Sequence, residues 1–200
     1  MSLIFIQAIL SGVLIGFSGL IYLLNMNLFG AIMFSTALVL IITFEIPLYT
    51  GKVGYILINK EYLKLFITLI GNLFGALLVG LYVNYFKFNS IIENLSILLN
   101  NKQIFEINFY NILYWFCSSF GCGMLIYLAV EGYKKIKNYL IVVLSVASFI
   151  LCGFNHCIAD FFYIVAYCGN DITIYLSTFL YLGIIILGNS IGAVLLNKIK

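Results

Sequence analysis

The hexapeptide GNLFGA at residues 71–76 recurs as GNSIGA at residues 188–193, and this repetition indicates how the chain is organised. Both copies lie inside long apolar stretches, near residues 63–86 and 172–196. Glycines four positions apart share one face of a helix, where they let a neighbouring helix approach closely. The sequence therefore predicts two related halves, each ending in a helix that carries this small-residue face.

The composition places these halves in a membrane. Of the 200 residues, 64% are hydrophobic and only 8% are charged, against roughly a quarter charged in an ordinary soluble domain. Apolar runs of about 20 residues are long enough to cross a bilayer as helices. We expect an all-α membrane protein with six transmembrane helices, near residues 3–24, 28–58, 63–86, 107–130, 139–167 and 172–196. The first is expected to be a retained helix, because no basic leader or cleavage site accompanies it.

Two of the six segments are too long for one straight crossing, and each contains a polar interruption. The second is interrupted at residues 45–52 and the fifth at residues 153–160. Irregular backbone at membrane depth survives only when it is buried in protein or lines a wet cavity. We therefore predict broken second and fifth helices.

The lysines indicate the orientation of the chain. With six crossings, eight lysines fall on the side of both termini and two on the other: Lys52, Lys60, Lys64, Lys134, Lys135, Lys137, Lys198 and Lys200 against Lys87 and Lys102. Cytoplasmic loops of membrane proteins carry the excess of Lys and Arg. We expect a multi-pass protein of the plasma or inner cell membrane with both termini in the cytoplasm.

Three crossings per half place the two halves in opposite orientations. The expected architecture is a single transmembrane domain over residues 1–200, with inverted repeats at approximately 1–86 and 107–200. In such inverted repeats the broken helices meet near the midplane, and the positive N-terminal end of each half-helix favours an anion there. The sequence thus predicts a path for a small polar solute, most consistent with a monovalent anion.

His156 is the only histidine, and it lies in the second interruption. An ionisable group at membrane depth is costly and is by default a functional hypothesis, although structural hydrogen bonding is the alternative. Asp160 follows one helical turn later, where it would either orient the imidazole or satisfy the backbone of the break. Glu45 beside the first interruption is open to the same two interpretations.

Five stretches resemble the formate–nitrite transporter family. LYTG at 48–51 resembles the family's LFTG loop, and GFNHCIADFF at 153–162 is similar to GFEHSIANMF. The GNLFGA copy, the LAV at 128–130 and the GNSIG at 188–192 fit the ends of the third, fourth and sixth helices. The order and spacing of these pieces hold along nearly the whole chain.

The resemblance implies a homo-pentamer of aquaporin-like six-helix protomers that moves formate, nitrite, lactate or hydrosulfide. It implies that His156 is the central pore histidine. Residues Leu48, Tyr49 and Thr50 would form one constriction, and Phe34 and Phe149 the other. Asn155 and Asp160 would belong to the same path beside the histidine.

The chain departs from the family pattern at positions that concern charge. Pro47 stands where an acidic residue is usual, and Gly123 where an asparagine is usual. No lysine stands at the position of the family's vestibule lysine, for which Lys102 is the nearest candidate. Asn155 replaces a glutamate and Asp160 an asparagine.

Three classes of function follow. The first is a channel or proton-coupled transporter for small monovalent weak-acid anions. The second is a channel for a neutral solute such as water, ammonia or undissociated hydrogen sulfide, which the gained Asp160 would suit. An intramembrane enzyme is less consistent, because Cys157, the nearest nucleophile, does not face His156 on a helix. No zinc-type cysteine spacing or basic stripe is present, so we expect no metal, cofactor or nucleic-acid partner.

Overall fold

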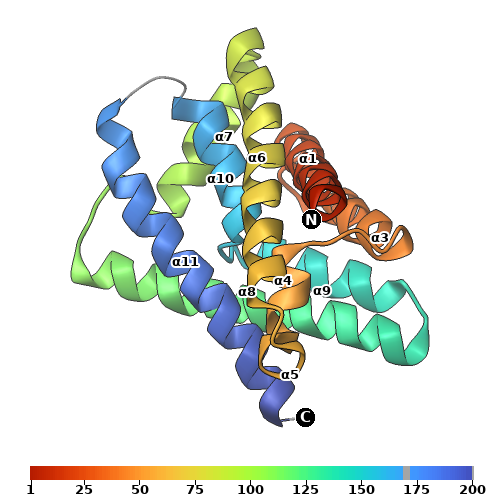
Figure 1. The fold of residues 1–200 in the computed structure, drawn as a ribbon. Coiled ribbons are helices and arrows are strands. Elements are labelled where there is room, and N and C mark those ends of the chain that lie inside the picture. The colour runs from red at the N-terminus through yellow and green to blue at the C-terminus, as the bar shows by residue number, and fades with distance from the viewer. Residues whose placement is uncertain (169–171, 200) are drawn as a thin grey trace.

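The computed structural model describes the backbone of residues 1–168 and 172–199, and their side chains apart from those of residues 89 and 172–177. Within these residues the chain forms helices and no strand (Figure 1). Four of the described helices are long and apolar enough to cross a membrane: α1 (Ser2–Leu24), α6 (Tyr62–Phe86), α8 (Phe109–Ile136) and α11 (Ile172–Ile199, assessed over Thr178–Ile199).

The second apolar segment is a series of short helices. It forms α2 (Leu28–Phe34) and α3 (Thr36–Thr43) and, after the first break, α4 (Tyr49–Lys52), η1 (Val53–Tyr55) and α5 (Ile56–Asn59). The helix stops after Thr43 because Glu45 adopts a left-handed φ of 54° and Pro47 has no N–H to donate. Ser35 separates α2 from α3, and its hydroxyl donates to the Ile32 carbonyl, so it offers that backbone oxygen a local partner.

The fifth segment is also broken, into α9 (Leu140–Leu151) and α10 (Cys157–Cys168). Gly153 lies in this second break with a φ of 67°, a conformation that glycine adopts without steric cost. The interruptions, at residues 44–48 and 152–156, therefore overlap the ranges predicted from sequence; each begins one residue earlier, and helix resumes three residues before the predicted end.

The repeated motif lies where helices pack most closely. The helix α1 packs along α6, and α8 packs along α11. A Cβ atom on Gly75 would lie 2.1 Å from the carbonyl oxygen of Ile9, and one on Gly192 would lie 2.1 Å from that of Phe120. Since real Cβ contacts are not that short, these positions need glycine, which confirms the predicted packing role.

One helix was not predicted. The helix α7 (Asn89–Asn101) occupies the stretch between the two halves and lies beside α10 (Figure 1). Its buried leucines and isoleucine, Ile91, Leu95, Leu98 and Leu99, repeat at helical spacing on one face. This pattern was available in the sequence. Lys102 is the C-cap residue of α7, so this helix places the lysine beside the second break.

Candidate functional site

An asparagine of the repeated motif forms the hydrogen bonds that hold the first break in place. The Asn72 side chain is fully buried and comes from α6. Its Nδ2 donates to the carbonyl oxygens of Ala8 at 2.8 Å and Pro47 at 3.1 Å, while its Oδ1 accepts the Tyr49 N–H at 2.8 Å. One side chain thus satisfies backbone groups on both sides of the break, which would otherwise be costly to bury.

Asn189 in α11 makes a matching set of hydrogen bonds at the second break. Its Nδ2 donates to the carbonyl oxygens of Ser119 at 2.8 Å and Asn155 at 2.9 Å, and its Oδ1 accepts the Cys157 N–H at 3.0 Å. In both copies of the motif the asparagine therefore donates to one carbonyl of a neighbouring long helix and to one carbonyl of the break, and accepts the N–H at which helix resumes. Sequence reasoning found the motif but assigned its glycines alone a role.

The two breaks meet at His156. Its Nε2 lies 3.0 Å from the Thr50 hydroxyl, and its Nδ1 accepts the N–H of Ala159 at 3.2 Å. A nitrogen that accepts an N–H carries no proton, so this pattern assigns the neutral imidazole with its hydrogen on Nε2, donated to Thr50. The imidazole is therefore oriented by Thr50 and Ala159. Of the two alternatives for Asp160, orientation of the imidazole is wrong, and its carboxylate instead bonds to the backbone of His156 in the break.

One aromatic ring covers a side of the imidazole, and a second packs behind it. The ring of Phe149 stacks on His156 with centroids 5.8 Å apart, and Phe34 packs edge-on against Phe149 at 6.1 Å. Both phenylalanines are almost completely buried. The structure thus brings these two predicted residues together beside the histidine.

The other two predicted residues of the first break lie apart from the imidazole. Leu48 borders a cavity of about 280 Å³ whose wall also carries Lys52, Lys134 and Lys137. The hydroxyl of Tyr49 lies 2.8 Å from Ser190 Oγ in α11. Tyr49 therefore joins the first break to the last helix, a bond that the family's usual phenylalanine does not make.

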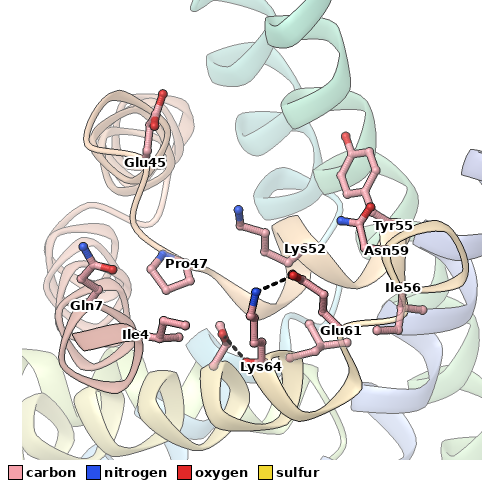
Figure 2. Close-up of a pocket in the computed structure, with 12 residues that line it drawn as sticks. Ile4, Gln7, Glu45, Pro47, Lys52, Tyr55, Ile56, Asn59, Glu61 and Lys64 are labelled. Atoms are coloured by element: carbon pink, nitrogen blue, oxygen red, sulfur yellow. Dashed lines mark hydrogen bonds and ion pairs between the residues drawn. The ribbon is translucent and has the colours of Figure 1, made fainter. Parts of the chain in front are cut away.

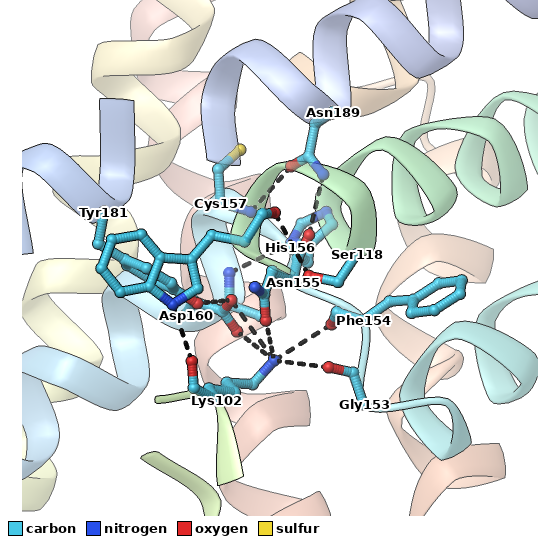
Figure 3. A network of polar contacts seen from close by, with 12 residues as sticks. Lys102, Ser118, Gly153, Phe154, Asn155, His156, Cys157, Asp160, Tyr181 and Asn189 are labelled. Carbon is cyan, nitrogen blue, oxygen red and sulfur yellow. Dashed lines mark hydrogen bonds and ion pairs between the residues drawn. The ribbon is translucent and has the colours of Figure 1, made fainter. Parts of the chain in front are cut away.

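Lys102 reaches into the second break, as Figure 3 shows. Its Nζ donates to Asn155 Oδ1 at 2.9 Å and to the carbonyl oxygens of Phe154 at 3.2 Å and Gly153 at 3.4 Å. It also forms an ion pair with Asp160, 3.1 Å from Oδ1, in which the two side chains are 5% and 1% exposed. The ammonium is thus surrounded by acceptors, and its charge is balanced by a carboxylate.

Two aromatic side chains complete this polar network. The Tyr181 hydroxyl donates to Asp160 Oδ2 at 2.6 Å, and Trp115 Nε1 donates to the backbone carbonyl of Lys102 at 3.0 Å. The two rings pack edge-on at 5.2 Å. Sequence reasoning missed both residues, because an aromatic residue in an apolar helix gives no signal of its partner.

Cavities lie on both sides of the site. One of about 180 Å³ is bounded by His156, Phe149, Lys102, Asp160 and a group of tyrosines. A further cavity of about 220 Å³ lies between α1, residues 45–52 and the start of α6, where Lys64 pairs with Glu61 (Figure 2). This last cavity does not touch His156 and shares only Glu45 and Lys52 with the cavity beside Leu48.

No group of three or more His, Cys, Asp or Glu side chains that would hold a metal ion occurs in the part of the chain that the structure describes. The polar groups at the breaks instead bind one another and backbone, apart from Asn155 Nδ2, which is buried without a hydrogen-bond partner among the described residues. Long apolar helices around two broken ones, whose ends meet at buried polar side chains, define a membrane channel or transporter.

Comparison with known proteins supports this class. A profile of the family described as "Formate/nitrite transporter" matches residues 1–199. The chain belongs to the formate/nitrite transporter family, whose members are transporters and channels and not enzymes. No protein with a curated description matches the sequence.

Two solved structures share the fold. One, described as a "Pentameric formate channel with formate bound", is 21% identical with a TM-score of 0.71, covering 98% of this chain and 90% of that one. The other, an "FNT family ion channel", is 20% identical with a TM-score of 0.74, covering 96% of this chain and 84% of that one. These two likenesses show a shared fold, and the profile match over residues 1–199 confirms the predicted family.

Proposed function

We propose that the protein is a channel or proton-coupled transporter for small monovalent weak-acid anions such as formate, nitrite or hydrosulfide. The observation that carries this proposal is the bond of 3.0 Å between Thr50 and His156, which joins the two helix breaks at a buried point. A bare anion at such a depth costs several kcal/mol, so the path must supply polar groups there. The similar formate channel supports this substrate class.

The proposal includes the arrangement of the chain in the membrane. Residues 1–200 form one domain of six crossings, whose inverted halves are approximately 1–86 and 107–200. The matched partners of Asn72 and Asn189 support the repeat. Both termini face the cytoplasm of a plasma or inner membrane, in agreement with the lysine count. The pentameric relative supports a homo-pentamer in which each protomer has its own path.

We propose that the path runs past Leu48 and Thr50 to His156 and then beside Phe34 and Phe149. The lysine-lined cavity lies at the cytoplasmic end, and the cavity with Lys102 lies at the other. Tyr49, Asn155 and Asp160 support the breaks that border the path.

The test is solute entry into proteoliposomes, measured for formate, nitrite and hydrosulfide at two pH values. His156→Phe removes the donor to Thr50, and we expect formate flux to change about tenfold or more with an altered pH dependence. Thr50→Val removes the acceptor, whereas Thr36→Val is the matched control, since Thr36 is exposed on α3. Wild-type vesicles that admit none of the three solutes faster than empty vesicles would refute the proposal.

A neutral solute is the second candidate, and the ion pair favours it. Because Asp160 balances the charge of Lys102, this end of the path offers no uncompensated positive charge from that lysine to draw in an anion. A neutral-solute channel would admit water or ammonia rapidly and formate only in proportion to its undissociated form. Light scattering by the same vesicles after an osmotic step separates the two candidates.

A further inference from the structure

One side of the second broken helix faces a single cavity. His156 lies just before α10, and Asp160 and Tyr163 follow at intervals of four and seven residues, so that all three share a helical face. All three line the cavity of about 180 Å³. Seven residues of α-helix span about 10 Å, which places Tyr163 that much further from the first break than His156.

The charged groups around this cavity already have partners. The Lys102 ammonium is held by Asn155 and Asp160, and the Asp160 carboxylate also accepts from Tyr181. Both nitrogens of His156 are occupied by Thr50 and Ala159. A solute that hydrogen-bonds to Lys102 or His156 therefore competes with the bonds that these side chains already make.

Tyr163 is different. Its side chain is 2% exposed, and its hydroxyl is buried without a hydrogen-bond partner among the described residues. A buried hydroxyl without a partner costs free energy, and a phenylalanine would fill the same space without that cost. Tyr22 and Tyr114 line the same cavity. An unpaired phenol beside the proposed path points to a partner that is present only during permeation.

We propose that Tyr163 is a specificity-determining residue that donates a hydrogen bond to a small oxygen acid, such as formate, in the cavity on the Lys102 side of His156. This inference rests on the proposed function. A phenol donates most strongly to a charged oxygen, because such charge-assisted bonds are about twice as strong as neutral ones. Hydrosulfide gains less from the same hydroxyl, because its sulfur is a weaker hydrogen-bond acceptor than a carboxylate oxygen.

The experiment compares formate and hydrosulfide flux through wild type, Tyr163→Phe and Tyr85→Phe. Tyr85 is the control because it lies at the end of α6 and is 80% exposed. We expect Tyr163→Phe to lower formate flux about tenfold and to leave hydrosulfide flux unchanged, as loss of one hydrogen bond predicts. Its thermal midpoint should equal or exceed that of wild type, because the hydroxyl has no partner to lose.

The outcomes separate this inference from the proposed function. An unchanged ratio of formate to hydrosulfide flux in Tyr163→Phe would overturn the role of Tyr163, whether both fluxes stay the same or both fall. A lowered thermal midpoint would show instead that the hydroxyl is structural. Wild-type protein that transports neither solute would refute the proposed function itself. A fall in formate flux alone, without a change in Tyr85→Phe, supports the inference.

Discussion

Replacing Lys102 by methionine tests the buried ion pair most directly. Methionine keeps most of the aliphatic length but removes the ammonium, which lies 3.1 Å from Asp160 Oδ1 and 2.9 Å from Asn155 Oδ1. Asp160, whose side chain is 1% exposed, would then keep its hydrogen bond from the Tyr181 hydroxyl but lose its counter-charge. Removal of one partner of a buried pair costs about 3–5 kcal/mol of the free energy of unfolding.

A double-mutant cycle isolates the pair from other effects. Lys102→Met and Asp160→Asn are made singly and together, and thermal unfolding in detergent is followed by fluorescence. The single tryptophan, Trp115, donates to the Lys102 backbone and so reports on the network itself. We expect each single variant to be destabilised. The destabilisation of the double variant should be about 2 kcal/mol smaller than the sum of the two single ones, because neither charge is then left alone.

The exposed pair of the same chain provides the control. Lys64 and Glu61 are 55% and 50% exposed, and such pairs contribute about 0–1 kcal/mol. Lys64→Met should therefore change the midpoint little. If the losses of unfolding free energy in the two single variants sum to that of the double variant within about 0.5 kcal/mol, the two charges do not stabilise each other and the reasoning is refuted.

Two further predictions concern the repeated motif. Gly75→Ala places a Cβ 2.1 Å from a backbone carbonyl and should lower the thermal midpoint strongly, whereas Gly183→Ala, with nothing within 4 Å, should match or exceed wild type; equal midpoints in the two variants would contradict the close approach. Asn189→Ala removes three buried hydrogen bonds and should destabilise by about 3 kcal/mol, measured by the same unfolding assay. A loss below about 1 kcal/mol would show that the second break does not depend on this side chain.

The long helices, the close packing at the GNxxGA motif and the two breaks were predictable because they depend on local pattern. Apolar runs, glycine spacing and polar interruptions within 45–52 and 153–160 are properties of short stretches. His156 was predictable because an ionisable residue in an apolar run stands out. The family motifs around it identified Thr50, which the structure places at hydrogen-bond distance.

The polar network was less predictable because its members are far apart in the sequence. The sequence around Tyr181 and Trp115 does not distinguish them from the aromatic residues on the outside of the apolar helices. Lys102 was noticed as a candidate, but its partners follow from α7, which positions it against the second break. The orientation of His156 was also missed, since one turn of spacing to Asp160 does not reveal that the carboxylate turns to Lys102.

The asparagine contacts also affect the order in which the chain matures during synthesis. Asn72 follows Tyr49 by 23 residues, so the first break is closed once α6 has emerged from the ribosome. Asn189 follows Cys157 by 32 residues and comes from α11, so the second break stays open until that helix is inserted. Until then the Cys157 N–H and the Asn155 carbonyl lack this partner at membrane depth. A nascent chain stopped before Asn189 would therefore present the Cys157 N–H and the Asn155 carbonyl without the partner that they have in the finished molecule.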